Sequence, residues 1–262
     1  IRMCNHPNTI EITVIISYYK NLPNLKLILL ALNQQSNQNF DVIISEDDHT
    51  DMASFLANQR KINCFPILHI NQKEDLVFRK NAMLNKAIKI AKGNTIVFID
   101  GDCIPHQHFI KEYIKTAKEN VFLYGRRVML SKKISENILA NKKLNQLCFT
   151  RLICSSSGFI KEGLYLPNLS LSFKTRGLLG CNWGIKKEYL LLVNGFDEDY
   201  VAAGVGEDND IEWRLKAVGL KMKSVKNKAI VYHIYHPRTY AEEKVRQNFV
   251  LLHKKQQLNH VK

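Results

Sequence analysis

Apolar residues in the first hundred positions form short runs separated by amphipathic segments. The run Ile12–Ser17 is rich in β-branched residues and has no polar alternation, which is typical of a strand buried on both faces of a parallel sheet. Pro23 opens a helical pattern, and a second helical pattern ends at Gly93. Further buried strands are predicted over Asp41–Ser45, Ile67–Ile70 and Thr95–Ile99. This alternation predicts a doubly wound α/β nucleotide-binding half with a mostly parallel central sheet flanked by helices.

The pattern loosens after residue 102. We expect a helix from Pro105 to about Lys118, a strand over Val121–Tyr124, and helices and loops covering the site between residues 131 and 167. Order returns with a short helix near residues 187–193, a helix from Asp208 to a stop at Gly219, and a final amphipathic helix over about residues 240–258. We therefore divide the chain into a nucleotide-sugar-binding half, residues 1–125, and an acceptor-binding and catalytic half, residues 126–262, of one domain.

Composition narrows the class of protein. The chain has 262 residues, 45% of them hydrophobic, which is enough for a substantial core. Its 38 basic and 24 acidic residues give a net charge of +14, which favours a polyanion, an anionic membrane surface or a phosphate-rich substrate. The six cysteines form no C-x-x-C pair, so we expect reduced thiols in a cytoplasmic protein. The longest apolar run, Leu25–Leu32, is too short to span a bilayer, leaving peripheral contact with the inner face of the cell membrane as the membrane option.

The first chemical signal is Asp100-Gly101-Asp102, which follows the predicted strand Thr95–Ile99. Open α/β sheets bind ligands at the carboxyl ends of their strands. Two carboxylates on either side of a glycine repel each other unless a cation lies near them, and a divalent ion that also holds phosphates meets this need. The alternative is an ordinary Asp-Gly turn with a second acid in solvent.

Three segments, in the order expected along the chain, resemble motifs of a known family. Residues 42–51 (VIISEDDHTD) and 93–102 (GNTIVFIDGD) resemble the strand-end and metal-binding DxD signatures of family 2 glycosyltransferases. Residues 180–215 resemble the C-terminal segment of β-1,4-galactosyltransferases, so the likeness spans roughly residues 10–236. It implies a GT-A fold, a nucleotide-sugar donor, and a divalent metal, Mn²⁺ or Mg²⁺.

The resemblance also implies residues that bind the nucleotide. Glu46 would accept a hydrogen bond from uracil, and Asp47 would lie beside the base or ribose. The family usually has two aspartates and a glycine where this chain has Glu46, Asp47 and Asp48, so a merely charged loop is the alternative. The remaining nucleotide and pyrophosphate residues would be Ser17, Tyr18, Tyr19, Arg79, Lys80 and Asp100, with the choice between Arg79 and Lys80 left open. Arg126 and Arg127 could reach the donor or the acceptor, although we favour a solvated role for both.

The metal would be held by Asp102 and a histidine from the C-terminal half, while Asp100 would serve the ribose or a metal-bound water. His233 and His236 in the sequence VYHIYHP are the candidate histidines, with spacing in favour of His233. A purely structural histidine is the alternative.

The resemblance implies that Asp208 is the base of an inverting transfer and that Glu207 binds the acceptor or the transferred sugar. A helix N-terminus lowers carboxylate pKa values, so we expect an ionised Asp208 at neutral pH; simple N-capping is the alternative. Trp183, with Asn182 and Gly180, would form the floor under the acceptor and donor sugar, and a core position is the alternative for Trp183.

These observations lead to one main hypothesis. It is an inverting, metal-dependent transfer of a hexose or N-acetylhexosamine, with galactose or GalNAc favoured, from a UDP-sugar to a glycan or lipid-linked glycan, in bacterial surface polysaccharide or lipopolysaccharide synthesis. A metal-dependent phosphodiesterase or nucleotidyltransferase acting on nucleic acid is the alternative enzyme. A non-catalytic nucleic-acid or membrane binder is the third class, but no element combines aromatic and basic residues as such binders do. We expect no nucleic-acid partner.

Overall fold

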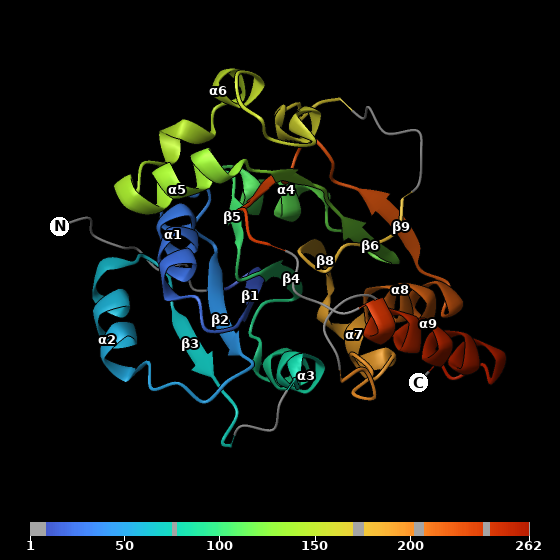
Figure 1. Ribbon diagram of the computed structural model, residues 1–262. Helices are drawn as coiled ribbons and strands as arrows, with labels where there is room; N and C mark the ends of the chain where they lie inside the picture. The colour runs from blue at the N-terminus through green and yellow to red at the C-terminus, as the bar shows by residue number, and fades with distance from the viewer. Residues whose placement is uncertain (1–8, 75–77, 170–175, 202–206, 238–241, 262) are drawn as a thin grey trace.

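A computed structural model describes residues 9–74, 78–169, 176–201, 207–237 and 242–261. Its centre is a seven-stranded sheet with the strand order β3-β2-β1-β4-β8-β6-β9 (Figure 1). The strands β1 to β4 pair in parallel, β8 is antiparallel to both β4 and β6, and β6 is parallel to β9. The strand bounds are β1 Ile12–Tyr18, β2 Phe40–Glu46, β3 Ile67–Ile70, β4 Thr95–Asp100, β6 Val121–Tyr124, β8 Asn182–Lys186 and β9 Lys221–Ser224. The predicted α/β class with a mostly parallel sheet is confirmed.

A second, three-stranded sheet with the order β5-β10-β7 lies beside the carboxyl end of β4. Its strands are β5 Cys103–Pro105, β7 Arg127–Met129 and β10 Val231–His233. β10 pairs antiparallel with β5 and parallel with β7. These three strands come from distant parts of the chain, so the small sheet brings residue 233 next to the DxD motif.

Helices cover both faces of the central sheet (Figure 1). The described helices are α1 Leu22–Asn33, α2 Ala53–Ile62, α3 Lys80–Ile90, α4 Phe109–Thr116, α5 Lys132–Asn141, η1 Leu144–Leu147, α6 Phe149–Ile153, η2 Ile160–Gly163, α7 Lys187–Leu192, α8 Glu207–Ala217 and α9 Glu242–Gln257. The expected helix from Pro105 begins later, because Pro105 ends β5 and α4 starts at Phe109.

The core has two parts, one on each face of the central sheet. Ile12, Val14 and Ile16 of β1 pack into the cluster that contains residues of α1 and α4. Ile15 points to the other face and joins a cluster with residues of α3, α7 and α8. Both sets of β1 side chains are buried, which is why the sequence shows a continuous apolar run.

Glycines permit two of the close approaches that hold these elements together. A Cβ at Gly93 would lie 2.4 Å from the backbone nitrogen of Thr13 in β1. A Cβ at Gly101 would lie 2.9 Å from the carbonyl oxygen of Ser17, to which the N–H of Gly101 donates a hydrogen bond. Only glycine allows the DxD turn to lie this close to the end of β1.

The structure also bears on membrane spans and on the state of the cysteines. No helix in the described ranges is long and apolar enough to cross a membrane. Cys103, Cys148, Cys154 and Cys181 are free thiols, as expected, but Cys64 is disulfide-bonded, so the expectation of fully reduced cysteines is wrong. The division at residue 125 stays a prediction, and the central sheet takes strands from both sides of it.

Candidate active site

The candidate active site lies at the carboxyl ends of β1, β2 and β4. Strand register places Tyr18 opposite Glu46 and Ser17 opposite Asp100. Parallel pairing therefore brings the three predicted motifs to one edge of the sheet, as the topology of open α/β sheets requires. Tyr18 is buried, whereas Tyr19 is exposed.

Asp102 lies next to both candidate histidines. The Oδ2 atom of Asp102 is 3.3 Å from Nε2 of His233 and 3.1 Å from Nε2 of His236. The backbone fixes this arrangement, because β10 pairs with β5 and the N–H of Ile234 donates to the carbonyl oxygen of Asp102. His233 is buried, and its Nδ1 has no hydrogen-bond partner among the described residues.

This donor set fits a divalent cation. Nδ1 of His236 lies 2.9 Å from the carbonyl oxygen of Pro237, and a carbonyl can only accept, so Nδ1 carries the proton. The Nε2 of a neutral His236 then directs a lone pair at the Asp102 carboxylate, and a cation between them removes the repulsion. Imidazoles and a carboxylate are common ligands of Mn²⁺ and similar ions, and a backbone hydrogen bond such as that of His236 orients the ligand.

Cys103 also lies near Asp102 and His233, within 4.8 Å, but its chemistry differs. Burial, followed by the neighbouring Cys181 and Asp102, raises the pKa of the Cys103 thiol. A thiol that stays protonated is a poor ligand, and Mn²⁺ and Mg²⁺ prefer oxygen and imidazole donors. Asp102, His233 and His236 are therefore the better set.

Lys80 lies among the acidic residues of the site. Its Nζ is 3.4 Å from Oδ1 of Asp100 and 3.7 Å from Oε1 of Glu207. Burial alone would lower the pKa of Lys80, but Asp100, Glu207 and Asp208 raise it, so the ammonium is charged. Arg79 is exposed, and its backbone N–H, not its guanidinium, donates to Asp47. The structure thus places Lys80 in the site and leaves Arg79 at its edge.

Asp208 lies at the start of α8, where its Oδ2 accepts a hydrogen bond of 2.7 Å from the N–H of Gly180. A Cβ at Gly180 would come within 2.5 Å of the Asp208 carboxylate, so this contact requires glycine. Burial, and then the neighbouring Glu207, raise the pKa of Asp208 to about 7. The expectation that the helix N-terminus would lower this pKa is wrong, because desolvation beside a second carboxylate outweighs the helix dipole.

Trp183 is a core residue. It is fully buried, stacks on Phe98 with ring centroids 4.5 Å apart, and meets Phe196 edge to face. No face of the indole is free to stack on a sugar, so the expected platform at Trp183 is wrong and the core alternative holds. The alternation of β8 turns this side chain into the cluster under α3 and α8.

Asn182 is also structural. Its amide donates to the carbonyl oxygens of Arg126 and Ala229, both at 2.9 Å, and its oxygen accepts from the hydroxyl of Tyr113 at 2.7 Å. The side chain is completely buried and its hydrogen-bonding groups are engaged, so it does not contact a sugar, contrary to expectation. It joins β8 to the chain before β7 and before β10.

Glu46 and Asp47 are more enclosed than the resemblance implies. Glu46 is fully buried, and its Oε2 lies 2.7 Å from Nε2 of His69 on β3. Asp47 accepts from the side-chain amide of Gln72 and the N–H of Arg79. Glu46 has no exposed atom for a uracil ring in this structure, so a direct contact from it is not supported.

Two further residues lie near the site: His69, which the sequence did not indicate, and Arg127, for which we favoured a solvated role. His69, the partner of Glu46, follows an unremarkable apolar stretch, and only its place on a neighbouring strand brings it there. Arg127 is half-buried rather than solvated, with its guanidinium 3.6 Å from Sγ of Cys181 and the field of Asp100 among the causes that raise its pKa. The signal for Arg127 was its position directly after a strand, which the sequence alone could not distinguish from an exposed turn.

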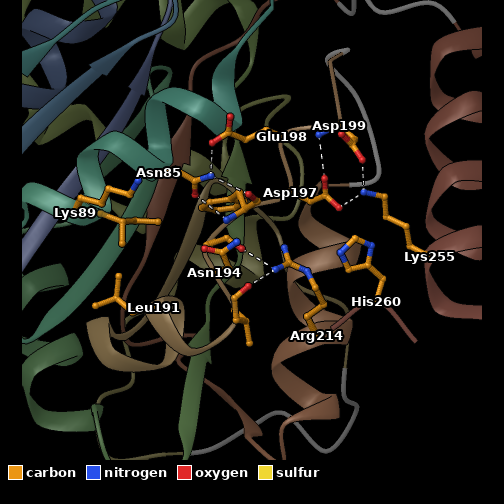
Figure 2. A pocket seen from close by; sticks show the side chains of 14 residues that line it. Asn85, Lys89, Leu191, Asn194, Asp197, Glu198, Asp199, Arg214, Lys255 and His260 are labelled. Carbon is orange, nitrogen blue, oxygen red and sulfur yellow. Dashed lines mark hydrogen bonds and ion pairs between the residues drawn. The ribbon is translucent and has the colours of Figure 1, made fainter. Parts of the chain in front are cut away.

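A hollow lies between α3, α7, α8 and the segment that contains α9 (Figure 2). Arg214 of α8 donates to Asp210 and to the carbonyl oxygens of Val193 and Gly195. Lys255 of α9 is buried and forms ion pairs with Asp197 and Asp199 (Figure 2). These contacts pair the charges of Arg214 and Lys255 and fix the turn at residues 194–197.

The fold and the cluster of acids, lysine and histidines define a glycosyltransferase of the GT-A class. Residues 13–191 match glycosyl transferase family 2, and residues 164–237 match the N-terminal domain of galactosyltransferase. The chain belongs to glycosyl transferase family 2.

Relatives and solved structures agree with this assignment. The chain is 24% identical over 239 residues to a chondroitin synthase of Escherichia coli, covering 85% of this chain and 34% of that protein. It therefore spans about a third of that relative's length. Its fold is similar to that of S. aureus TarS, with a TM-score of 0.64 and 16% identity over 94% of this chain and 39% of that one. It is also similar to GalNAc-T7 with UDP, GalNAc and Mn²⁺, with a TM-score of 0.65 and 12% identity over 94% of this chain and 48% of that one.

Proposed function

We propose that this protein transfers a hexose or N-acetylhexosamine, with galactose or GalNAc favoured, from a UDP-sugar to a hydroxyl of a glycan, with inversion. The observation that carries the proposal is the meeting of Asp208, Lys80, Asp100 and the Asp102–His233–His236 group at one sheet edge. A relative called chondroitin synthase and a fold neighbour with UDP, GalNAc and Mn²⁺ support this substrate class.

Asp208 is the proposed base. As the acceptor oxygen attacks the anomeric carbon, its proton passes to the Asp208 carboxylate, and the bond from that carbon to the diphosphate breaks with its electron pair leaving on UDP. A base with a pKa of about 7 is well matched to proton transfer near neutral pH. Gly180 holds the carboxylate through its N–H, and Glu207, paired with Lys80, lies one residue away to bind sugar hydroxyls.

Asp102, His233 and His236 would hold Mn²⁺ or Mg²⁺, and the bound ion would supply neutralisation of the diphosphate charge. Asp100 would serve the ribose side, with its charge balanced by Lys80. Ser17, Tyr19 and Asp47 would line the nucleoside. The acceptor would be a glycan or a lipid-linked glycan, and the net charge of +14 is compatible with peripheral binding at the cytoplasmic face of an anionic membrane.

The alternative of a metal-dependent phosphodiesterase acting on nucleic acid has less support. It uses Asp102 and the histidines but leaves the Asp208–Gly180 contact and the Lys80–Glu207 pair without a role. No observation on the described residues favours it.

Calorimetric titration with UDP, in the presence and absence of Mn²⁺, tests the donor half of the proposal. We expect binding that requires the ion and is weaker for GDP. Asp102→Ala should weaken this binding, whereas Glu136→Gln, at an exposed position of α5, should not. Failure of the wild-type protein to bind UDP with Mn²⁺ present would refute the proposal.

Transfer is then measured with UDP-galactose, UDP-GalNAc, UDP-glucose and UDP-GlcNAc on desulfated chondroitin oligosaccharides. Asp208→Asn should retain UDP binding and lose at least about a thousandfold in transfer rate. Transfer at the wild-type rate by this variant would remove Asp208 from the role of base.

A further inference from the structure

The three-stranded sheet carries a straight row of residues away from the histidines. Strand register aligns Cys103 of β5, His233 of β10 and Met129 of β7. The row continues to Gly158, which forms two backbone hydrogen bonds with Met129, of 2.7 and 2.9 Å. Neighbouring strands are about 4.8 Å apart, so Gly158 lies about 10 Å from His233 along the row.

Phe159 stands directly after this row, in an uncommon state. It is the most exposed Phe, Tyr or Trp among the described residues, with 66% of its surface accessible. Its backbone is left-handed, with φ of 53° and ψ of 34°. A left-handed conformation is unfavourable for a bulky residue, and exposing an aromatic ring forgoes the free energy of its burial. Phe159 therefore combines an unfavourable backbone conformation with an exposed aromatic ring.

The surrounding loop holds this residue firmly. The hydroxyl of Ser157 accepts from the N–H of Ser131, and the hydroxyl of Ser155 donates to the carbonyl oxygen of Leu152. On the other side, Gly163 at the end of η2 packs against Val128 of β7. Phe159 therefore lies between two contacts with β7, the backbone hydrogen bonds of Gly158 to Met129 and the packing of Gly163 against Val128.

The row has no side chain at Gly158, where a larger residue could block a ligand. Gly158 has no side chain, and a Cβ built there would lie 3.4 Å from Cβ of Met129, on the same face. No side chain at position 158 therefore stands between Met129 and the segment that begins at Phe159.

We propose that Phe159 is the stacking platform of an acceptor subsite, which binds a sugar ring of the glycan some distance from the reacting hydroxyl. The proposal rests on the proposed function, because it assigns the acceptor of the same transfer. An exposed aromatic face suits the apolar face of a pyranose ring, and an aromatic side chain has only two χ angles to fix on binding. The distance of about 10 Å along the row corresponds to a short oligosaccharide rather than a single sugar.

Three variants separate the ring from the backbone. Phe159→Asn removes the ring but keeps a residue that tolerates the left-handed conformation. Phe159→Tyr keeps an aromatic face. Phe249→Ala, at an exposed position of α9, is the control for loss of an exposed aromatic ring.

Hexasaccharides of desulfated chondroitin, chitin and cellulose are titrated calorimetrically into each protein saturated with UDP and Mn²⁺. We expect Phe159→Asn to weaken binding of the preferred hexasaccharide by roughly three- to tenfold, and Phe159→Tyr and Phe249→Ala to bind like the wild type. The disaccharide of the same series should show no difference between the variants, because it does not reach Phe159.

Other results overturn the platform. Equal hexasaccharide binding by Phe159→Asn and the wild type would do so, as would a loss of UDP binding by that variant. If the wild-type protein binds UDP but none of the three hexasaccharides, the platform is refuted and the proposed donor site is not. A wild-type protein that binds no UDP would instead contradict the proposed function itself.

Discussion

The ammonium of Lys80 lies 3.7 Å from the carboxylate of Glu207, which joins the first turn of α3 to the first turn of α8. The same ammonium is 3.4 Å from Asp100. One cation therefore balances acids from the DxD strand and from the helix that carries the proposed base. The site depends on this balance because its carboxylates are close together and partly desolvated.

Replacing Lys80 by methionine should raise the pKa of Asp208 further, because Lys80 is among the groups that lower it. We expect kcat/KM at pH 7 to fall by at least about tenfold, with part of the loss recovered at higher pH. The pH dependence of transfer measures this effect. Lys86→Met, an exposed change on the same helix, should leave the profile unchanged.

In the wild-type protein, kcat/KM should rise with pH through about 7. The base must be a carboxylate to accept a proton, and burial with Glu207 raises the pKa of Asp208 to about 7, so the active form increases as the pH passes this value. Rates measured between pH 5.5 and 9 at saturating metal would show this limb. A flat profile across this range would contradict the assignment of the base.

Asp208→Asn should stabilise the fold at pH 8. A carboxyl whose pKa is raised by folding binds its proton more tightly in the native state, so its contribution to the free energy of unfolding declines between about pH 4 and pH 7. A neutral amide avoids that loss and can still accept from Gly180. We expect a gain of about 1 kcal/mol or more, seen as a rise of about 2–4 °C in Tm at pH 8 and little change at pH 4.

His233→Ala and His236→Ala should each weaken Mn²⁺ binding in the presence of UDP, by about tenfold or more. Both imidazoles face the Asp102 carboxylate, and the buried Nδ1 of His233 has no protein partner among the described residues. Electron paramagnetic resonance of free Mn²⁺ gives the affinities. His253→Ala on α9 is the control, since this histidine is exposed and belongs to another element.

Asn182→Ala should destabilise the protein strongly. It leaves the carbonyl oxygens of Arg126 and Ala229 and the hydroxyl of Tyr113 without their buried partner. We expect a loss of about 3 kcal/mol or more in the free energy of unfolding, measured by urea denaturation. Asn141→Ala, at an exposed position that ends α5, should cost about 0.5 kcal/mol or less.

The sequence predicted the central strands well because β1, β2 and β4 are buried on both faces and read as unbroken apolar runs. It did not predict the three-residue strands β5, β7 and β10, since pairing between distant segments, not local pattern, defines them. The DxD motif was noticed because two carboxylates directly follow a buried strand, and the histidines were expected from the family resemblance.

The predictions from sequence that were wrong concern how deeply particular side chains are buried. Trp183 and Asn182 lie in a segment that resembles a sugar-binding motif, yet the alternation of β8 places both inside the core. Asp208 is at a helix N-terminus, as expected, but the sequence could not show that Glu207 and low solvent access would raise its pKa. Desolvation depends on what packs around a group, and that is fixed only by the tertiary fold.

The ion pairs of Lys255 have a practical consequence for any shortened version of this chain. Lys255 of α9 neutralises Asp197 and Asp199 (Figure 2). The backbone carbonyl of Asp197 also accepts a hydrogen bond from Asn81, the neighbour of Lys80. Cutting the chain before α9 would leave these acids uncompensated at the turn that supports the first turn of α3. A minimal catalytic fragment must therefore extend through α9, more than a hundred residues after the DxD motif in the sequence.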